Sequence, residues 1–186
     1  DRRRQLAAGK DIATLIYTSG STGRPKGCVL SHRYELAAGE AYVERGGLVV
    51  FRECGERLYN PLPLFHVFAA YPILMSMIAS GAHVVFPTPQ GYRGEGVFDN
   101  FWKLVEHWKV TYMVTVPTAL SALMQRPVNA DVSTLRGAFS GSAPLPIELF
   151  TRFEKATGVQ IVEGYGLTEC TCLVSINPPD GNKKIG

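Results

Sequence analysis

The sequence predicts an α/β fold in which helices lie on the faces of a mostly parallel β-sheet. Short apolar runs of strand length alternate with segments of helical periodicity along the 186 residues. This alternation is typical of βαβ units, whose crossover helices pack on the sheet. Polar loops directly follow predicted strands at 18–27, 61–66, 140–146 and 163–169. Because ligands of such sheets bind beyond the carboxyl ends of the strands, we expect all four loops at one edge.

The first half of the chain begins with an apolar run at 12–17, which predicts a strand, and a helix is expected to open at Ser31. Residues 57–60 then lead into the proline-rich loop at 61–66, and a helix is expected from there to about residue 80. The run at 81–87 predicts a buried strand, because it is apolar and is stopped by a proline.

The second half continues the alternation. Apolar residues at helical spacing over 97–109 predict an amphipathic helix whose aromatic stripe faces the core. Pro117 and Pro146 are each expected to begin a helix, and Gly158 to end the second one. Further strands are predicted at 112–116, 135–139 and 159–162.

Composition and charge argue against several classes of protein. The hydrophobic fraction of 46% and the charged fraction of 19% are typical of a globular protein. The net charge of +3 equals the contribution of Arg2, Arg3 and Arg4, so no basic face for nucleic acid is indicated. We expect neither a membrane span nor a signal peptide, because no sufficiently long apolar run occurs. The four cysteines form no C-x-x-C pair, which favours free thiols in a reducing cytoplasm.

The segment 17–27 reads Y-T-S-G-S-T-G-R-P-K-G and predicts a polyphosphate-binding loop. Its glycines allow close approach of the backbone to a ligand, with N–H groups turned inward. Hydroxyl groups donate to phosphate oxygens, and a lysine adds positive charge. The residues that carry this prediction are Thr18, Ser19, Gly20, Ser21, Thr22, Gly23 and Lys26.

Two other interpretations of this loop are less favoured. A flexible Gly/Ser linker has no need of Pro25, which stiffens the chain just before Lys26. A P-loop NTPase requires Ser or Thr directly after the lysine, to hold magnesium, whereas Gly27 stands here.

Taken in order, the motifs resemble those of the adenylate-forming superfamily, which includes acyl- and aryl-CoA synthetases, luciferases and nonribosomal peptide adenylation domains. The similarity is greatest to AMP-forming acyl-CoA synthetases and spans the chain from about residue 10 onward. It is carried by the phosphate loop at 17–27, Ser31-His32, Pro63-Leu-Phe-His66, Gly141-Ser-Ala-Pro-Leu145 and Tyr165-Gly-Leu-Thr-Glu169.

This resemblance implies that residues 1–186 are the central part of a large N-terminal AMP-binding domain, without the C-terminal domain that bears a catalytic lysine. It also implies the reaction. A carboxylic acid, fatty or otherwise acyl, reacts with ATP to give an acyl-adenylate and pyrophosphate, and coenzyme A then takes the acyl group and releases AMP. Mg²⁺ is the implied metal, and the implied partner is a small-molecule acid.

The resemblance assigns roles to individual residues. Catalytic roles fall to Lys26, His66, Thr168 and Glu169, with Glu169 also the magnesium-associated carboxylate and His66 beside the substrate carboxylate. Val67, Phe68, Tyr71 and Phe139 either line the acid pocket or belong to the core. The nucleotide-binding set comprises the loop residues named above together with Ser142, Ala143, Pro144, Glu163, Gly164, Tyr165, Gly166 and Thr168.

Two alternatives remain open. An amino-acid adenylation domain commonly carries an aspartate after an aromatic residue, to pair with the substrate amine, whereas the corresponding segment here, 65–68, contains no acid. The chain could also be a nucleotide-binding fragment without catalysis.

Overall fold

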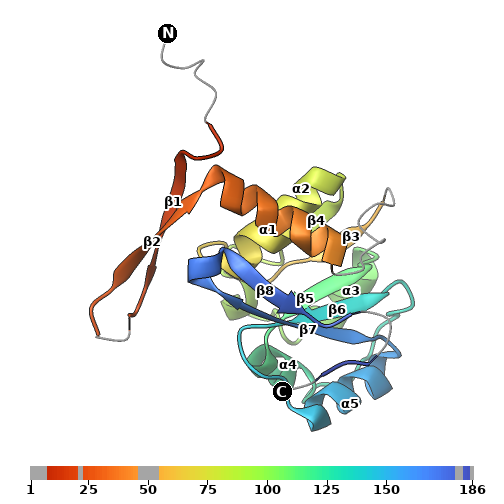
Figure 1. The fold of residues 1–186 in the computed structure, drawn as a ribbon. Helices are drawn as coiled ribbons and strands as arrows, with labels where there is room; N and C mark the ends of the chain where they lie inside the picture. Colours follow the sequence, from red (N-terminus) through yellow and green to blue (C-terminus); the bar gives the residue numbers. More distant parts are fainter. Residues whose placement is uncertain (1–7, 21–22, 46–54, 179–181, 185–186) are drawn as a thin grey trace.

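The computed structural model describes residues 8–20, 23–45, 55–178 and 182–184, which form a six-stranded sheet flanked by helices and a separate two-stranded hairpin (Figure 1). The first five strands of the sheet are mutually parallel, and the last is antiparallel to its neighbour. Their order is β4 (His83–Val85), β3 (Arg57–Tyr59), β5 (Tyr112–Thr115), β6 (Gly137–Ser140), β7 (Ile161–Leu167) and β8 (Cys172–Ile176).

Helices cover both faces of this sheet and create two hydrophobic cores. The first core lies under α1 (His32–Arg45), the π-helix η3 (Ala69–Met75) and α2 (Ser76–Ser80). The second lies under α3 (Phe101–His107), α4 (Pro117–Leu123) and α5 (Ile147–Thr157). Short 3-10 turns occur at η4 (Gly91–Arg93) and η5 (Thr168–Cys170). No helix in the described part of the chain has the length and hydrophobicity of a membrane span.

The predicted fold class is confirmed, and most elements form where the apolar patterns place them. The strands predicted at 81–87, 112–116 and 135–139 are β4, β5 and β6. Pro117 is the first residue of α4. Gly158 ends α5 with a φ of 71°, the left-handed conformation expected of a helix C-terminal glycine.

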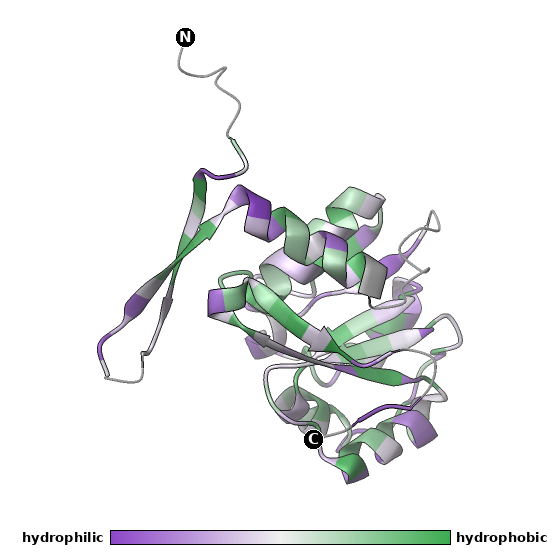
Figure 2. Ribbon diagram, in the orientation of Figure 1, coloured by the Kyte–Doolittle hydropathy of each residue, from purple (hydrophilic) through white to green (hydrophobic). Residues whose placement is uncertain are grey.

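The first predicted strand is real, but its expected place in the sheet is wrong. β1 (Ile12–Thr18) pairs antiparallel with β2 (Lys26–Ser31), a strand that was not predicted, and the two form a hairpin that projects from the body (Figure 1). A parallel partner would require a crossover of a dozen or more residues, which the short loop between these strands does not provide. Figure 2 shows hydrophobic residues on both strands of the hairpin. Ile16 and Cys28 pack against the first core, whereas Leu15 and Val29 are exposed.

The predicted loop at 163–169 is also mostly strand. β7 continues to Leu167, only Thr168 and Glu169 belong to the following turn, and β8 then returns along β7. The glycines in this segment are typical of a loop when the segment is considered alone. Pairing with β8 supplies the hydrogen bonds that make it a strand, and a bulge between Tyr165 and Gly166 shifts its register.

Candidate active site

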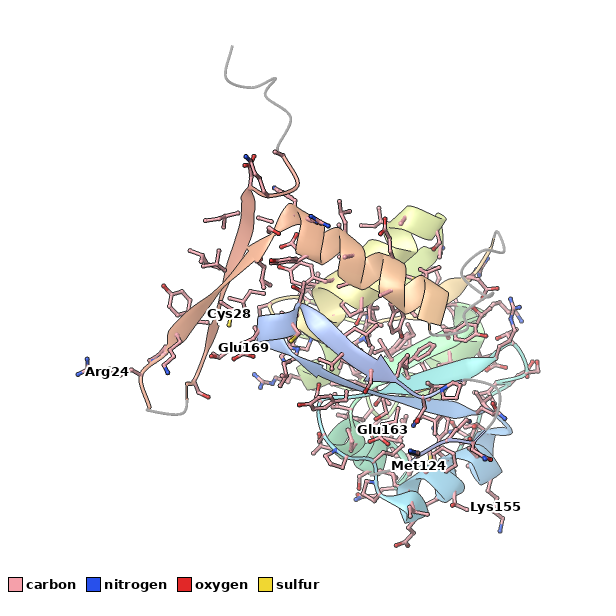
Figure 3. All side chains as sticks on the ribbon, viewed as in Figure 1. Arg24, Cys28, Met124, Lys155, Glu163 and Glu169 are labelled. Carbon is pink, nitrogen blue, oxygen red and sulfur yellow. The ribbon has the colours of Figure 1, made fainter. Side chains whose placement is uncertain are left out.

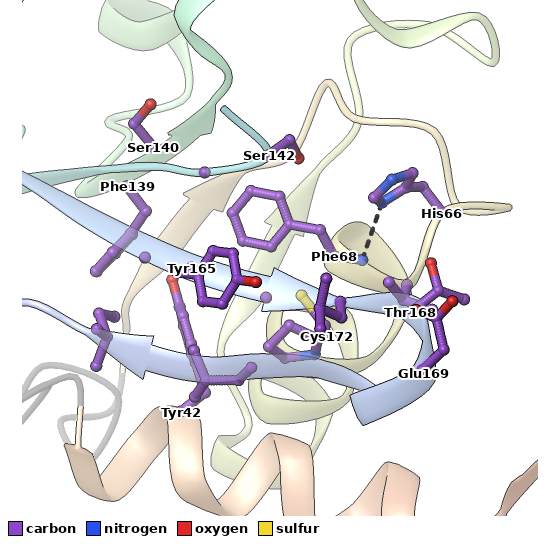
Figure 4. A pocket seen from close by; sticks show the side chains of 18 of the residues that line it. Tyr42, His66, Phe68, Phe139, Ser140, Ser142, Tyr165, Thr168, Glu169 and Cys172 are labelled. Atoms are coloured by element: carbon purple, nitrogen blue, oxygen red, sulfur yellow. Dashed lines mark hydrogen bonds between the residues drawn. The ribbon is translucent and has the colours of Figure 1, made fainter. Parts of the chain in front are cut away.

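A cavity of about 490 Å³ lies where β6 and β7 end, and residues of η3, of α1 and of the loop end of the hairpin also line it (Figure 4). Ten of the residues assigned to the site from the motifs line this first cavity. They are Thr18, Ser19, Gly20, His66, Ser142, Gly164, Tyr165, Gly166, Thr168 and Glu169. The sequence left open whether Val67, Phe68 and Phe139 belong to the acid pocket or to the core, and all three line the first cavity. The motifs are therefore brought together although they are far apart in the sequence.

A second cavity, of about 550 Å³, adjoins the first and shares Ser142, Gly164, Tyr165, Gly166 and Ile176 with it. Ala143, Pro144 and Glu163 line only this second cavity, together with part of β8 and the residues that follow it. Tyr165 is 58% exposed, so its ring is accessible as a flat surface. The residues predicted to form the two walls around an adenine therefore face a common space.

The segment after β6 is held in an unusual backbone conformation. Ser142 has a φ of 72°, which is uncommon for a residue that carries a side chain. A Cβ on the buried Gly141 would lie 3.2 Å from the carbonyl oxygen of Gly164, so β6 and β7 approach closely here. Gly141 and Ser142 line the first cavity, and residues 142–144 line the second.

Glu163 holds that segment in place. One carboxylate oxygen, Oε1, accepts a hydrogen bond of 2.8 Å from the backbone N–H of Leu145. The backbone carbonyl of Glu163 accepts another, of 2.9 Å, from Asn177. Glu163 was predicted to belong to the nucleotide-binding set, and its carboxylate is hydrogen-bonded to the loop that forms the wall.

We predict that Glu163→Ala raises the KM for ATP about tenfold, because a hydrogen bond to a charged group contributes about 1.5–3 kcal/mol. Glu163→Gln keeps an acceptor oxygen and should restore most of the affinity. The KM for ATP of both variants is measured by steady-state kinetics of pyrophosphate exchange at varied ATP concentration. Equal loss in the two variants would show that the charge matters, rather than the hydrogen bond to Leu145.

The turn at η5 brings Thr168 and Glu169 to the mouth of the first cavity. Thr171 and Cys172 follow it with φ values of 53° and 88°, so the chain reverses sharply into β8. A Cβ on Gly166 would overlap the carbonyl oxygen of Cys172, so only glycine permits this approach of the two strands. η5 also lies against β2, with Glu169 beside Cys28 (Figure 3).

The phosphate loop is only partly at the cavity. Thr18, Ser19 and Gly20 line it from the end of β1. Of the residues that the structure describes, Gly23 and Lys26 are exposed on the hairpin and lie outside both cavities, with Lys26 paired to Thr18 across the strands. Ser21 and Thr22 lie outside the described residues. The hairpin therefore presents its first strand to the cavity and its lysine to the surrounding solvent.

His66 lies between the first cavity and a wider cavity of about 1220 Å³ lined by 60–66 and 86–93. Its Nδ1 accepts a hydrogen bond of 3.3 Å from the backbone N–H of Phe68 (Figure 4). Nδ1 is therefore unprotonated, and Nε2 carries the hydrogen of the neutral ring. Desolvation lowers the pKa of His66 below its ordinary value of 6.5, so the neutral form prevails at pH 7.

We therefore predict the direction of one pH effect. Because the pKa of His66 lies below the ordinary histidine value of 6.5, the ring stays neutral as the pH falls from 7 to 6.5. It takes up a proton only at a pH below 6.5. Protonation would remove the acceptor at Nδ1, so kcat/KM for the acid should fall only in that lower range. The pH profile of His66→Asn should lack this decline. An unchanged acid limb in the variant would contradict a role for His66.

Some residues of the site were not predicted. Tyr42 of α1 and Cys172, Leu173 and Ile176 of β8 line the first cavity. Tyr71, by contrast, belongs to the first core, where it is 7% exposed and its hydroxyl lies 2.7 Å from that of Thr14. No local signal in the sequence of α1 shows that Tyr42 reaches a ligand cavity.

The carboxylate of Glu169 is suited to a magnesium ion that arrives with a nucleotide. Among the described residues no group of three metal-ligating side chains occurs. Mg²⁺ bound to nucleotides usually takes one or two carboxylates and completes its shell with phosphate oxygens and water. A single exposed carboxylate beside Thr168, opposite the phosphate loop, fits this mode.

Comparison with known proteins places this geometry in a family. The profile of AMP-binding enzymes matches residues 1–186. The chain belongs to the AMP-binding enzyme family. It is 31% identical over 191 residues to the marinolic acid–CoA ligase of Pseudoalteromonas sp. (strain SANK 73390), an alignment that covers 98% of this chain and 28% of that ligase.

Solved structures of this family have the same fold. The ATP-bound MatB of Rhodopseudomonas palustris superposes with a TM-score of 0.77 at 29% identity, over 96% of this chain and 33% of that one. An anthranilate CoA ligase, AuaEII, in complex with anthranoyl-AMP gives a TM-score of 0.75 at 32% identity. The superposition covers 92% of this chain and 32% of that ligase. The chain thus spans 28–33% of the length of these relatives. The resemblance inferred from the motifs is confirmed.

Proposed function

We propose that this chain supplies part of the active site of an AMP-forming acyl-CoA synthetase, whose C-terminal lysine-bearing domain lies outside residues 1–186. The observation that carries the proposal is the first cavity. It joins hydroxyl groups of the phosphate loop, Thr168 and Glu169 at one end to an apolar interior at the other. A polyphosphate and a carboxylic acid with an apolar group are the pair of reactants that this arrangement fits.

In the proposed first step, a carboxylate oxygen of the acid attacks the α-phosphorus of ATP. The bond from that phosphorus to the bridging oxygen breaks, and pyrophosphate leaves with the electron pair. Two anions must approach, so positioning and charge neutralisation dominate catalysis. We assign Thr168 to the α-phosphate, and Thr18 and Ser19 at the cavity to the β- and γ-phosphates. Ser21, Thr22 and Lys26 of the same loop are assigned to these phosphates as well, and Lys26 is exposed in the structure. When bound at Glu169, Mg²⁺ supplies positive charge to the phosphate oxygens.

The nucleotide is expected to extend into the second cavity. Tyr165 offers its ring to one face of the adenine, and the backbone of Ser142, Ala143 and Pro144 forms the opposite wall. Gly164 and Gly166 carry no side chain and leave room at the edge of the adenine. Glu163 supports this wall through Leu145, as described above.

In the second step, the sulfur of coenzyme A attacks the acyl carbonyl carbon, and AMP leaves as the carbon–oxygen bond breaks. The thiol arm is expected to approach through the wider cavity, because His66, Phe68 and Ser142 line both it and the first cavity. Neutral His66 would then stand beside the reacting carboxyl group without adding charge. A cytoplasmic location and a role in fatty acid metabolism are part of this proposal.

An amino-acid adenylation domain is the second candidate within the family. Among the described residues that line the first cavity, the carboxylate of Glu169 is the one acidic group, and it lies at the phosphate end (Figure 4). The apolar interior thus offers no counter-charge for a substrate ammonium group. This observation favours simple carboxylic acids.

The proposal is tested by pyrophosphate exchange in the full-length protein that carries this chain. Labelled pyrophosphate should enter ATP only when a carboxylic acid is present. A panel of fatty, aryl and amino acids then separates the candidates. Exchange with amino acids alone would support the adenylation domain, and no exchange with any acid, despite ATP binding by calorimetry, would support a non-catalytic nucleotide-binding module.

A further inference from the structure

The first cavity has a polar end and an apolar end. His66, Thr168 and Glu169 lie together at one end, and Tyr42 and Phe139 lie at the other (Figure 4). Further residues that line the cavity are Val67, Phe68, Pro72, Val162 and Cys172. A substrate whose carboxylate reaches the α-phosphate and whose hydrocarbon group stays within the first cavity therefore extends toward Tyr42 and Phe139.

These two aromatic rings close the apolar end. They come from different elements, α1 and β6, and their centroids are 5.3 Å apart at an interplanar angle of 59°. Both residues are almost fully buried, with 1% and 2% of their surface exposed. Phe139 is in turn stacked on Tyr112 of β5, at 5.9 Å. Because both rings are backed by packed elements, neither can move aside without disturbing the first core.

We propose that the Tyr42–Phe139 pair is the floor of the acid pocket and restricts the substrate to monocarboxylic acids with a compact apolar group, aryl or medium-chain acyl. This inference rests on the proposed function. A cavity of about 490 Å³ lies in the lower half of the range of about 300–1,000 Å³ for small-molecule sites. The same volume must also hold the carboxylate and the α-phosphate, so a long hydrocarbon chain does not fit above the floor.

The floor offers no charged side chain that could pair with a second carboxylate of the substrate. Burial raises the pKa of the Tyr42 hydroxyl well above its ordinary value, so it stays neutral at every physiological pH. Burial likewise raises the pKa of the Cys172 thiol to about 12, so this side chain is neutral too. A dicarboxylic acid would therefore place an unpaired charge among apolar groups, which is strongly unfavourable.

The test measures kcat/KM for acid-dependent pyrophosphate exchange in the full-length protein. The acids are benzoate, octanoate, hexadecanoate and the dicarboxylate glutarate. For the wild type, benzoate or octanoate should exceed hexadecanoate about tenfold or more, and glutarate should be poor, since one methylene in an apolar pocket already changes rates about 10–200-fold. Preference for hexadecanoate or glutarate by the wild type would overturn the proposal without any variant.

Tyr42→Ala opens the floor and should raise the ratio of hexadecanoate to octanoate about tenfold. Tyr34→Ala is the matched control, because Tyr34 is in the same helix but 58% exposed. An unchanged ratio in a folded Tyr42→Ala protein would overturn the proposal, and so would an equal shift in both variants. If no acid supports exchange, the proposed function itself fails, and that outcome is distinct from an unchanged ratio.

Discussion

Gly166→Ala is expected to lower the pyrophosphate exchange rate about a hundredfold and to lower the melting temperature of the full-length protein. The new methyl group would overlap the carbonyl oxygen of Cys172, which is backbone and cannot rotate away. β7 and β8 must then separate, and a displacement of about 1 Å in a catalytic group can cost about a hundredfold in rate. Overpacking of this kind also costs typically about 1–3 kcal/mol of stability.

Gly39→Ala in α1 provides the control for the added methyl group. Its Cβ would meet Met75 at 3.6 Å, an ordinary van der Waals contact, and alanine favours a helix over glycine by roughly 0.5–1 kcal/mol. Thermal unfolding followed by circular dichroism and the exchange assay measure both variants. A Gly166→Ala protein with wild-type rate and melting temperature would show that β7 and β8 do not need this close approach.

Glu169→Gln should lower kcat about 10²–10³-fold and raise the Mg²⁺ concentration needed for half-maximal rate. The substitution preserves the shape of the side chain but removes its charge, and loss of one preorganised electrostatic group has a cost of this size. The measurement is exchange rate against Mg²⁺ concentration at saturating ATP. Thr168 and the phosphate loop remain in place, so ATP should still bind.

Glu148→Gln removes another exposed carboxylate, from the first turn of α5, and should change neither kcat nor the Mg²⁺ dependence. If Glu169→Gln lowered kcat at unchanged Mg²⁺ dependence, the carboxylate would act on the reaction by a route other than metal binding. An unchanged kcat would remove Glu169 from the catalytic site.

The elements that the sequence predicts well depend on local apolar patterns. β5 and β6 are short, fully buried runs, and their order along the chain follows from the alternation with helices. The site residues of the motifs at 61–66 and 140–146 then meet because parallel strands end at one edge. For these segments, the sequence was sufficient to predict that the candidate residues lie at a common cavity.

The parts that were missed depend on pairing between segments. β2 and β8 are recognisable as strands only once β1 and β7 are in place beside them. The first strand of the hairpin was therefore assigned to the sheet, and the glycine-rich half of β7 was assigned to a loop. Tyr42 is a further example, because its contact with Phe139 joins a helix to a distant strand and is set by packing rather than by local sequence. Long-range contacts of this kind leave no periodic signal.

The central claim is that the acid is activated through an acyl-adenylate, and oxygen-18 transfer tests it most directly. The full-length protein is given an acid labelled in both carboxylate oxygens, together with ATP, Mg²⁺ and coenzyme A, and the products are examined by mass spectrometry. Attack of the carboxylate on the α-phosphorus predicts one labelled oxygen in AMP and none in pyrophosphate. Label in inorganic phosphate, with ADP as the other product, would mean attack at the γ-phosphorus and would contradict the account.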